Sequence, residues 1–187
     1  MWRHRLSRWL SSAISAVLLL TVAGCQGQSD PARDLAEFRD VAIQSCERAM
    51  TDGVLEHTVD YSYQAVMVPK DQAVDDYSAA WVEEPDTYSL IYETDFFFAC
   101  ADANMFSLYE EAGMESTLRV TKTADGFETV DMENPQQIKL TYVVQEGLIR
   151  SASNQDLEQP IVIEIEYGPD LQKSQEIIRR ALEQASY

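Results

Sequence analysis

The chain has 187 residues and carries 32 Asp and Glu against 14 Lys and Arg, which gives a formal net charge of −18 at pH 7. Nucleic acids and anionic lipid headgroups bind proteins through cations, so this acidity argues against both classes of ligand. Two explanations of the acidity stay open, namely a cationic partner and a salt-rich environment that screens self-repulsion, and we favour the second as the simpler. The length is sufficient for one domain with its own core.

The first 25 residues have the pattern of an export signal that ends in a cysteine. Arg3, Arg5 and Arg8 precede an uncharged, largely apolar run over 10–22, and no acidic residue occurs before Asp30. This run is shorter than the roughly 20 residues that span a bilayer, so the pattern predicts a secretory signal rather than a transmembrane helix. The alternative is an ordinary cleavable signal in which the cysteine is incidental.

The segment Val22-Ala23-Gly24-Cys25 resembles the lipobox of bacterial lipoproteins, and the resemblance covers residues 1–25 only. It implies removal of a signal peptide 1–24 and attachment of acyl chains such as palmitate to Cys25, which would hold the chain to a membrane through this residue. Because Gln26 rather than Asp follows the cysteine, the resemblance favours the outer membrane, with the protein facing the periplasm. Residues 25–33 would then form a lipidated tether and residues 34–187 a single domain.

Two further cysteines, Cys46 and Cys100, remain if Cys25 is lipidated. Two leftover cysteines in an exported chain most often form a disulfide, which is what we predict here. It would join a core-facing helix cysteine to a core-facing strand cysteine. The alternatives are a buried pair of free thiols and a redox pair, although neither cysteine lies in a Cys-x-x-Cys motif that would lower a thiol pKa.

The first half of the exported chain mixes helical and strand patterns. Residues 34–50 carry apolar residues at helical spacing before Asp52-Gly53, which predicts a helix. Alternation predicts one strand over 57–68 and a second, more clearly patterned strand over 87–100. Between and after these strands, the sequence fits a short helix or an irregular loop over 71–84 and a turn of helix within 101–113.

The second half is typical of an antiparallel meander followed by a helix. Turn signals separate neighbouring strand patterns, and the predicted elements are a hairpin of 117–123 with 127–132, a hairpin of 137–145 with 148–153, a strand over 160–167 and a helix capped by Asp170. Hairpins imply antiparallel pairing. We therefore predict an α+β fold, with one antiparallel sheet of about six or seven strands and N- and C-terminal helices packed on it.

Catalytic signatures are missing from the sequence. It has no Gly-x-Ser-x-Gly, His-Glu-x-x-His, P-loop or Gly-x-Gly-x-x-Gly motif, and its acidic doublets are no more frequent than chance predicts. His57 is the only histidine after the signal segment, and a hydrogen-bonded residue at a strand end is a simpler interpretation of it than a general base. We predict no catalytic residue, no metal site and no cofactor.

Each of the predicted strands 57–68 and 87–100 has a second face, opposite the face that carries most of its apolar residues. Four apolar residues on these second faces could form a modest patch for a partner or ligand, although packing in the core is the favoured interpretation. They are Val66, Val68, Ile91 and Phe97. The sequence favours a lipid-anchored, non-enzymatic interaction or accessory module, whose partners are the membrane and an envelope protein. One alternative is a domain that binds a small apolar or cationic ligand between its helices and its sheet. A less favoured one is a hydrolase that uses carboxylates near His57.

Overall fold

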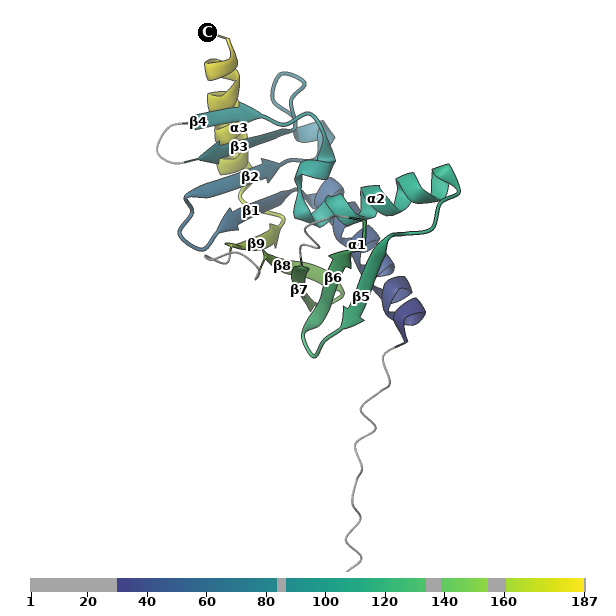
Figure 1. Ribbon diagram of the computed structural model, residues 1–187. Helices are drawn as coiled ribbons and strands as arrows, with labels where there is room; N and C mark the ends of the chain where they lie inside the picture. Colours follow the sequence, from purple (N-terminus) through teal and green to yellow (C-terminus); the bar gives the residue numbers. More distant parts are fainter. Residues whose placement is uncertain (1–29, 84–86, 134–138, 155–160, 187) are drawn as a thin grey trace, which may run out of the picture.

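The computed structural model describes residues 30–83, 87–133, 139–154 and 161–186 (Figure 1). The elements of these residues, in chain order, are α1 (Pro31–Asp52), β1 (Val54–Thr58), β2 (Tyr63–Met67), η1 (Lys70–Gln72), β3 (Ala79–Glu83), β4 (Thr87–Leu90), η2 (Thr94–Phe96), α2 (Phe98–Ala112), β5 (Leu118–Lys122), β6 (Gly126–Asp131), β7 (Lys139–Gln145), β8 (Leu148–Asn154), β9 (Ile161–Tyr167) and α3 (Leu171–Ala185).

The nine strands of the described residues form one sheet with the order β4-β3-β2-β1-β9-β8-β7-β6-β5. Strands β1 to β4 make one meander and β5 to β9 make another, and antiparallel pairing of β1 with β9 joins the two, with His57 opposite Glu164. The predicted α+β class with one antiparallel sheet is confirmed. The described residues contribute nine strands to it, in place of the six or seven expected.

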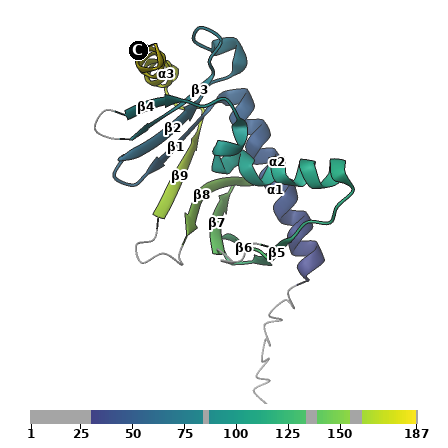
Figure 2. The ribbon, with the colours of Figure 1, turned by 45° about the horizontal axis from the view of Figure 1, so that its top comes forward.

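The helices cover the sheet from both sides (Figures 1 and 2). Helices α1 and α2 pack against each other over one face and enclose the main core, in which Phe38 of α1 meets Phe127 and Tyr142 of the sheet. Helix α3 packs on the opposite face against β2, β3 and β4, where Ile178 joins a smaller cluster with Val66. Both terminal helices therefore lie on the sheet, as predicted.

Helix α1 starts and stops at clear sequence signals. The Asp30 carboxylate accepts hydrogen bonds from the backbone N–H groups of Ala32 and Arg33, and Pro31 occupies the first helical position, where its missing N–H costs nothing. At the other end Gly53 has φ +83°, and a Cβ there would lie 2.8 Å from the Met67 carbonyl oxygen. The helix is longer at both ends than the predicted range of 34–50.

The single strand predicted over 57–68 is two strands, because the chain reverses between Thr58 and Tyr63. Asp60 closes this turn, since its carboxylate accepts a hydrogen bond from the Thr58 hydroxyl at 2.8 Å. Tyr61 has φ +58°, a left-handed conformation that belongs to a turn and not to a strand. The alternating pattern through Tyr61 was therefore coincidental.

The helix or loop expected over 71–84 is instead an irregular turn followed by strand β3. Asp75 and Asp76 both have positive φ, which is incompatible with a right-handed helix. Strand β3 pairs with β2 and β4, and its successive residues Ala79 and Ala80 contact the two opposite clusters. A strand with apolar side chains on both faces lacks simple alternation, which explains the misleading pattern.

The strand predicted over 87–100 ends at Leu90, and helix α2 occupies Phe98–Ala112. Cys100 therefore lies in the first turn of a helix and not on a strand. The aromatic residues that suggested a long buried strand face are divided, because Tyr92 and Phe96 are exposed whereas Phe98 packs on the core. The predicted turn within 101–113 is part of the 15-residue helix.

The second half follows the prediction closely. Strands β5 and β6 form one hairpin and β7 and β8 form the other, with Glu146 and Gly147 at positive φ in the second turn. Strand β9 leads to α3, whose first turn is capped by Asp170 through the backbone N–H groups of Gln172 and Lys173. These elements are set by local turn and cap chemistry, so the sequence pattern locates them well.

Candidate functional site

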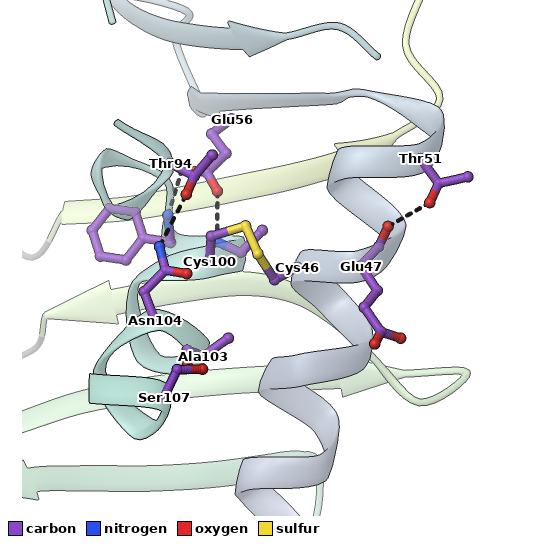
Figure 3. Close-up of a disulfide and its surroundings, with 11 residues drawn as sticks. Cys46, Glu47, Thr51, Glu56, Thr94, Cys100, Ala103, Asn104 and Ser107 are labelled. Carbon is purple, nitrogen blue, oxygen red and sulfur yellow. Dashed lines mark hydrogen bonds between the residues drawn. A yellow bond between two sulfur atoms is a disulfide. The ribbon is translucent and has the colours of Figure 1, made fainter. Parts of the chain in front are cut away.

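A disulfide joins the two helices that cover the main core (Figure 3). Cys46 belongs to the C-terminal half of α1 and Cys100 to the first turn of α2, with Cα atoms 4.5 Å apart. Both residues are buried. The predicted pairing is confirmed, but it joins helix to helix rather than helix to sheet.

A buried carboxylate from β1 caps the start of α2 beside this disulfide. Helix α2 has no side-chain cap of its own at Phe97. The Glu56 carboxylate supplies one from a distant part of the chain, accepting hydrogen bonds from the backbone N–H groups of Phe98 at 2.9 Å and Ala99 at 2.8 Å (Figure 3). These N–H groups would otherwise lack an intrahelical partner, and the positive end of the helix dipole favours an anion there.

The environment of Glu56 favours its protonated form despite this cap. Its side chain is fully buried, and the loss of hydration raises its pKa from 4.5 to about 7, although the two backbone N–H donors oppose the rise. A general acid has to reach a substrate. Glu56 is sealed between β1 and α2, so the geometry supports a role in holding α2 in place.

A second buried carboxyl fixes α2 from its inner side. The Tyr142 hydroxyl of β7 donates a hydrogen bond of 2.6 Å to Asp102 of α2. Burial raises the pKa of Asp102, and burial together with the Asp102 charge raises the pKa of Tyr142 well above its usual value. Helix α2 is thus held by a disulfide and by two buried carboxyls, all within its first five residues.

His57 lies on the other face of the sheet, away from α1 and α2. Its Nδ1 is 3.0 Å from the Thr58 carbonyl oxygen, and its Nε2 is 3.2 Å from Glu166 and 3.9 Å from Glu164, both on β9. The ring of Tyr61 stacks on the imidazole with a centroid distance of 4.0 Å, so His57 is only 1% exposed. The left-handed turn described above brings Tyr61 into this position.

The hydrogen-bond partners of His57 are all acceptors. Both ring nitrogens of His57 are therefore occupied by contacts within the fold, Nδ1 by a backbone carbonyl and Nε2 by carboxylates of two half-exposed glutamates. A general base would need a free Nε2 lone pair directed at a substrate. The structure thus brings His57 and a carboxylate into hydrogen-bond reach, but directs Nε2 at Glu166 of the same sheet under the covering Tyr61 ring.

Two grooves between helices and sheet among the described residues are open to solvent. One, of about 520 Å³, lies between α1 and the β7–β8 hairpin and is lined mainly by polar side chains such as Arg48, Glu146 and Arg150. Another, of about 420 Å³, runs between α3 and the sheet and is lined by Val82, Tyr88 and other residues. Both differ from the enclosed, tyrosine-lined pocket that a small-ligand site between helices and sheet would use.

The four residues considered as a surface patch do not come together on the surface. Val66 and Val68 are buried in the cluster under α3, whereas Ile91 and Phe97 are buried in the main core on the opposite side of the sheet. The core interpretation of these residues is the one the structure supports. Cys25, the predicted lipidation site, lies outside the described residues.

Sequence reasoning missed Glu56 and Asp102, because their partners are about 40 residues away and no local pattern marks them. In the described part of the chain, no group of three or more His, Cys, Asp or Glu side chains is arranged to hold a metal ion. The described helices include none that is long and apolar enough to cross a membrane. Comparison of the chain with known protein families, with curated proteins and with solved structures finds no match.

Proposed function

We propose that this chain is a bacterial envelope lipoprotein, held by acyl chains on Cys25 to the outer membrane and facing the periplasm. Its folded part is a non-enzymatic module that docks another envelope component. The observation that carries the proposal is the segment Val22-Ala23-Gly24-Cys25 after a basic and apolar leader. Two or three acyl chains give effectively permanent attachment, whereas one chain alone binds only marginally.

The distance between Cys25 and the fold supports close attachment. Only residues 26–30 separate the cysteine from the first residue of α1, and five residues span at most about 18 Å when extended. The start of α1 lies at the same end of the molecule as the β5–β6 hairpin, and the C-terminal end of α3 lies at the opposite end (Figure 1). An anchored domain would therefore keep its β5–β6 end near the membrane and direct α3 away from it.

The docking part of the proposal is tested by crosslinking in intact cells of the native host. The tagged full chain should recover one or more envelope proteins reproducibly, and Cys25→Ser should reduce their recovery, because the domain is then no longer concentrated at the membrane. The control is an unrelated globular domain that carries residues 1–30 of this chain. Recovery of the same proteins with that control, or of no reproducible partner with the full chain, would contradict the proposal.

A further inference from the structure

The outer face of α2 carries an apolar stripe that is open to solvent. Ala101, Met105, Leu108 and Ala112 recur at steps of four, three and four residues, which places them on one side of the helix. Leu108 is 65% exposed. A groove of about 370 Å³ follows the stripe and is lined by Ala101, Asn104, Met105, Ser107, Leu108 and Glu111.

Two further exposed apolar residues precede and follow α2 in the chain. Phe96 of η2 is 65% exposed, and a hydrogen bond of 3.0 Å from the Asn104 amide to the Thr94 hydroxyl holds η2 against α2 (Figure 3). Met114, just beyond the end of α2, is 55% exposed. We call Ala101, Met105, Leu108 and Ala112, which share one side of the helix, the α2 stripe.

Helix α2 is apolar on two sides and is packed on only one of them. Its inner side buries Cys100, Ala103 and Phe106 in the main core. An apolar side of a helix normally packs against another surface. The α2 stripe is therefore a partly exposed apolar face of the kind that marks an interaction site.

The charge beside the C-terminal half of the α2 stripe is mainly negative. Glu110, Glu111 and Glu115 are exposed there. Glu110 pairs with Arg39 of α1, whereas the described ion pairs include no cation partner for Glu111 or Glu115. A salt-rich environment would explain acidity alone. It does not explain an apolar stripe with an acidic border.

We propose that the α2 stripe binds a basic amphipathic helix of another envelope protein, with the apolar side of that helix along the stripe and its Lys or Arg side chains toward the acidic border. Apolar contact supplies affinity in helix-in-groove recognition, and complementary charge supplies selectivity. A second copy of this chain is disfavoured, because it would bring the same acidic border against itself. This inference rests on the proposed docking function and names its surface.

The test uses the full chain carrying Cys25→Ser, so that binding does not depend on the lipid. The probe is a fluorescent 18-residue peptide with leucines on one helical face and lysines on the other, and its affinity is measured by anisotropy. Leu108→Gln should weaken binding about tenfold, as expected when one buried leucine side chain is lost. Met50→Gln is the matched control, because Met50 is an exposed apolar residue of α1 outside the stripe.

Methionine methyl NMR locates the contact independently of the variants. The methyl signal of Met105 should shift when the peptide is added, whereas those of Met50 on α1 and of the buried Met67 should not. A scrambled peptide of the same composition should bind more weakly, and Glu111→Gln should reduce the affinity for the ordered peptide. Circular dichroism with thermal unfolding shows that each variant is folded.

Several outcomes would overturn the inference. Charge alone would attract the probe if Leu108→Gln bound it as tightly as the parent chain, or if the scrambled peptide bound as tightly as the ordered one. A shift of the Met50 methyl signal in place of the Met105 signal would place the contact outside the α2 stripe. Sedimentation that reveals a dimer lost in Leu108→Gln would assign the stripe to a second copy. Binding to phosphatidylcholine vesicles that is lost in Leu108→Gln would assign it to lipid. None of these results bears on whether Cys25 carries a lipid. The proposed lipid anchor and the proposed docking surface on α2 can therefore fail independently of each other.

Discussion

Glu56 combines two opposing demands on one carboxyl group. As an anion it caps two backbone N–H groups of α2, and as a neutral acid it avoids the cost of a charge in the core. Because burial is the larger effect, the folded protein keeps a proton on Glu56 up to about pH 7, whereas the unfolded chain releases it near pH 4.5. The folded state thus binds more protons than the unfolded state between these values.

This difference predicts a decrease in stability with rising pH. The contribution of Glu56 is fully present below pH 4.5, falls as the pH rises toward about 7, and amounts to roughly 3 kcal/mol over that window. Denaturant unfolding of the parent chain and of Glu56→Gln should give curves of free energy against pH that converge or cross across this range. The raised pKa of Asp102 also makes stability fall with rising pH, but Asp102 is present in both proteins and does not change the difference between their curves. Parallel curves would show that Glu56 has an ordinary pKa when folded.

At the scale of elements, α2 depends on contacts made with residues far away in the sequence. Its cap comes from β1, its disulfide from α1 and its inner hydrogen bond from β7. This explains why the sequence predicted the hairpins and α3 but not α2. The hairpins need only a local turn signal such as Asp125-Gly126, whereas α2 has no cap residue of its own and is apolar on two sides.

The candidate sites differ in the same way, because the sequence predicts features that local signals set and misses those that depend on contacts between distant residues. Cys46 and Cys100 could be paired from the sequence, because the predicted export and lipidation of Cys25 would leave these two cysteines with one simple arrangement. His57 and Glu166 are 109 residues apart, and only the pairing of β1 with β9 brings them together. Tyr61, which covers the imidazole, was assigned to a strand because alternation continues through a turn that only its positive φ reveals.

Loss of the disulfide should release α2 before the sheet. In the Cys25→Ser background, where Cys46 and Cys100 are the remaining cysteines, reduction opens a link between residues 54 positions apart. Chain entropy assigns about 4 kcal/mol to a loop of this length. Hydrogen exchange should accelerate more over 98–112 than over 139–154. Equal acceleration in both segments would mean that the disulfide stabilises the whole fold without a particular role at α2.

At the scale of the whole molecule, both edges of the sheet are partly covered by helical side chains. The Tyr88 N–H of edge strand β4 donates to Gln184 of α3, and the Lys122 N–H of edge strand β5 donates to Asp34 of α1. Occupied edge donors disfavour addition of a further strand at these positions. A partner is therefore better accommodated on a helix face, which agrees with the proposed use of α2.

The lipid on Cys25 is the claim on which location and docking depend, and one comparison tests it directly. Cells that express the parent chain or Cys25→Ser are labelled with radioactive palmitate and fractionated. We expect the parent chain to be labelled and to remain in the membrane fraction, and the variant to be unlabelled and released to the soluble fraction, because an acidic domain without acyl chains has little affinity for anionic headgroups. A parent chain without label and a variant that stays equally membrane-bound would contradict the account.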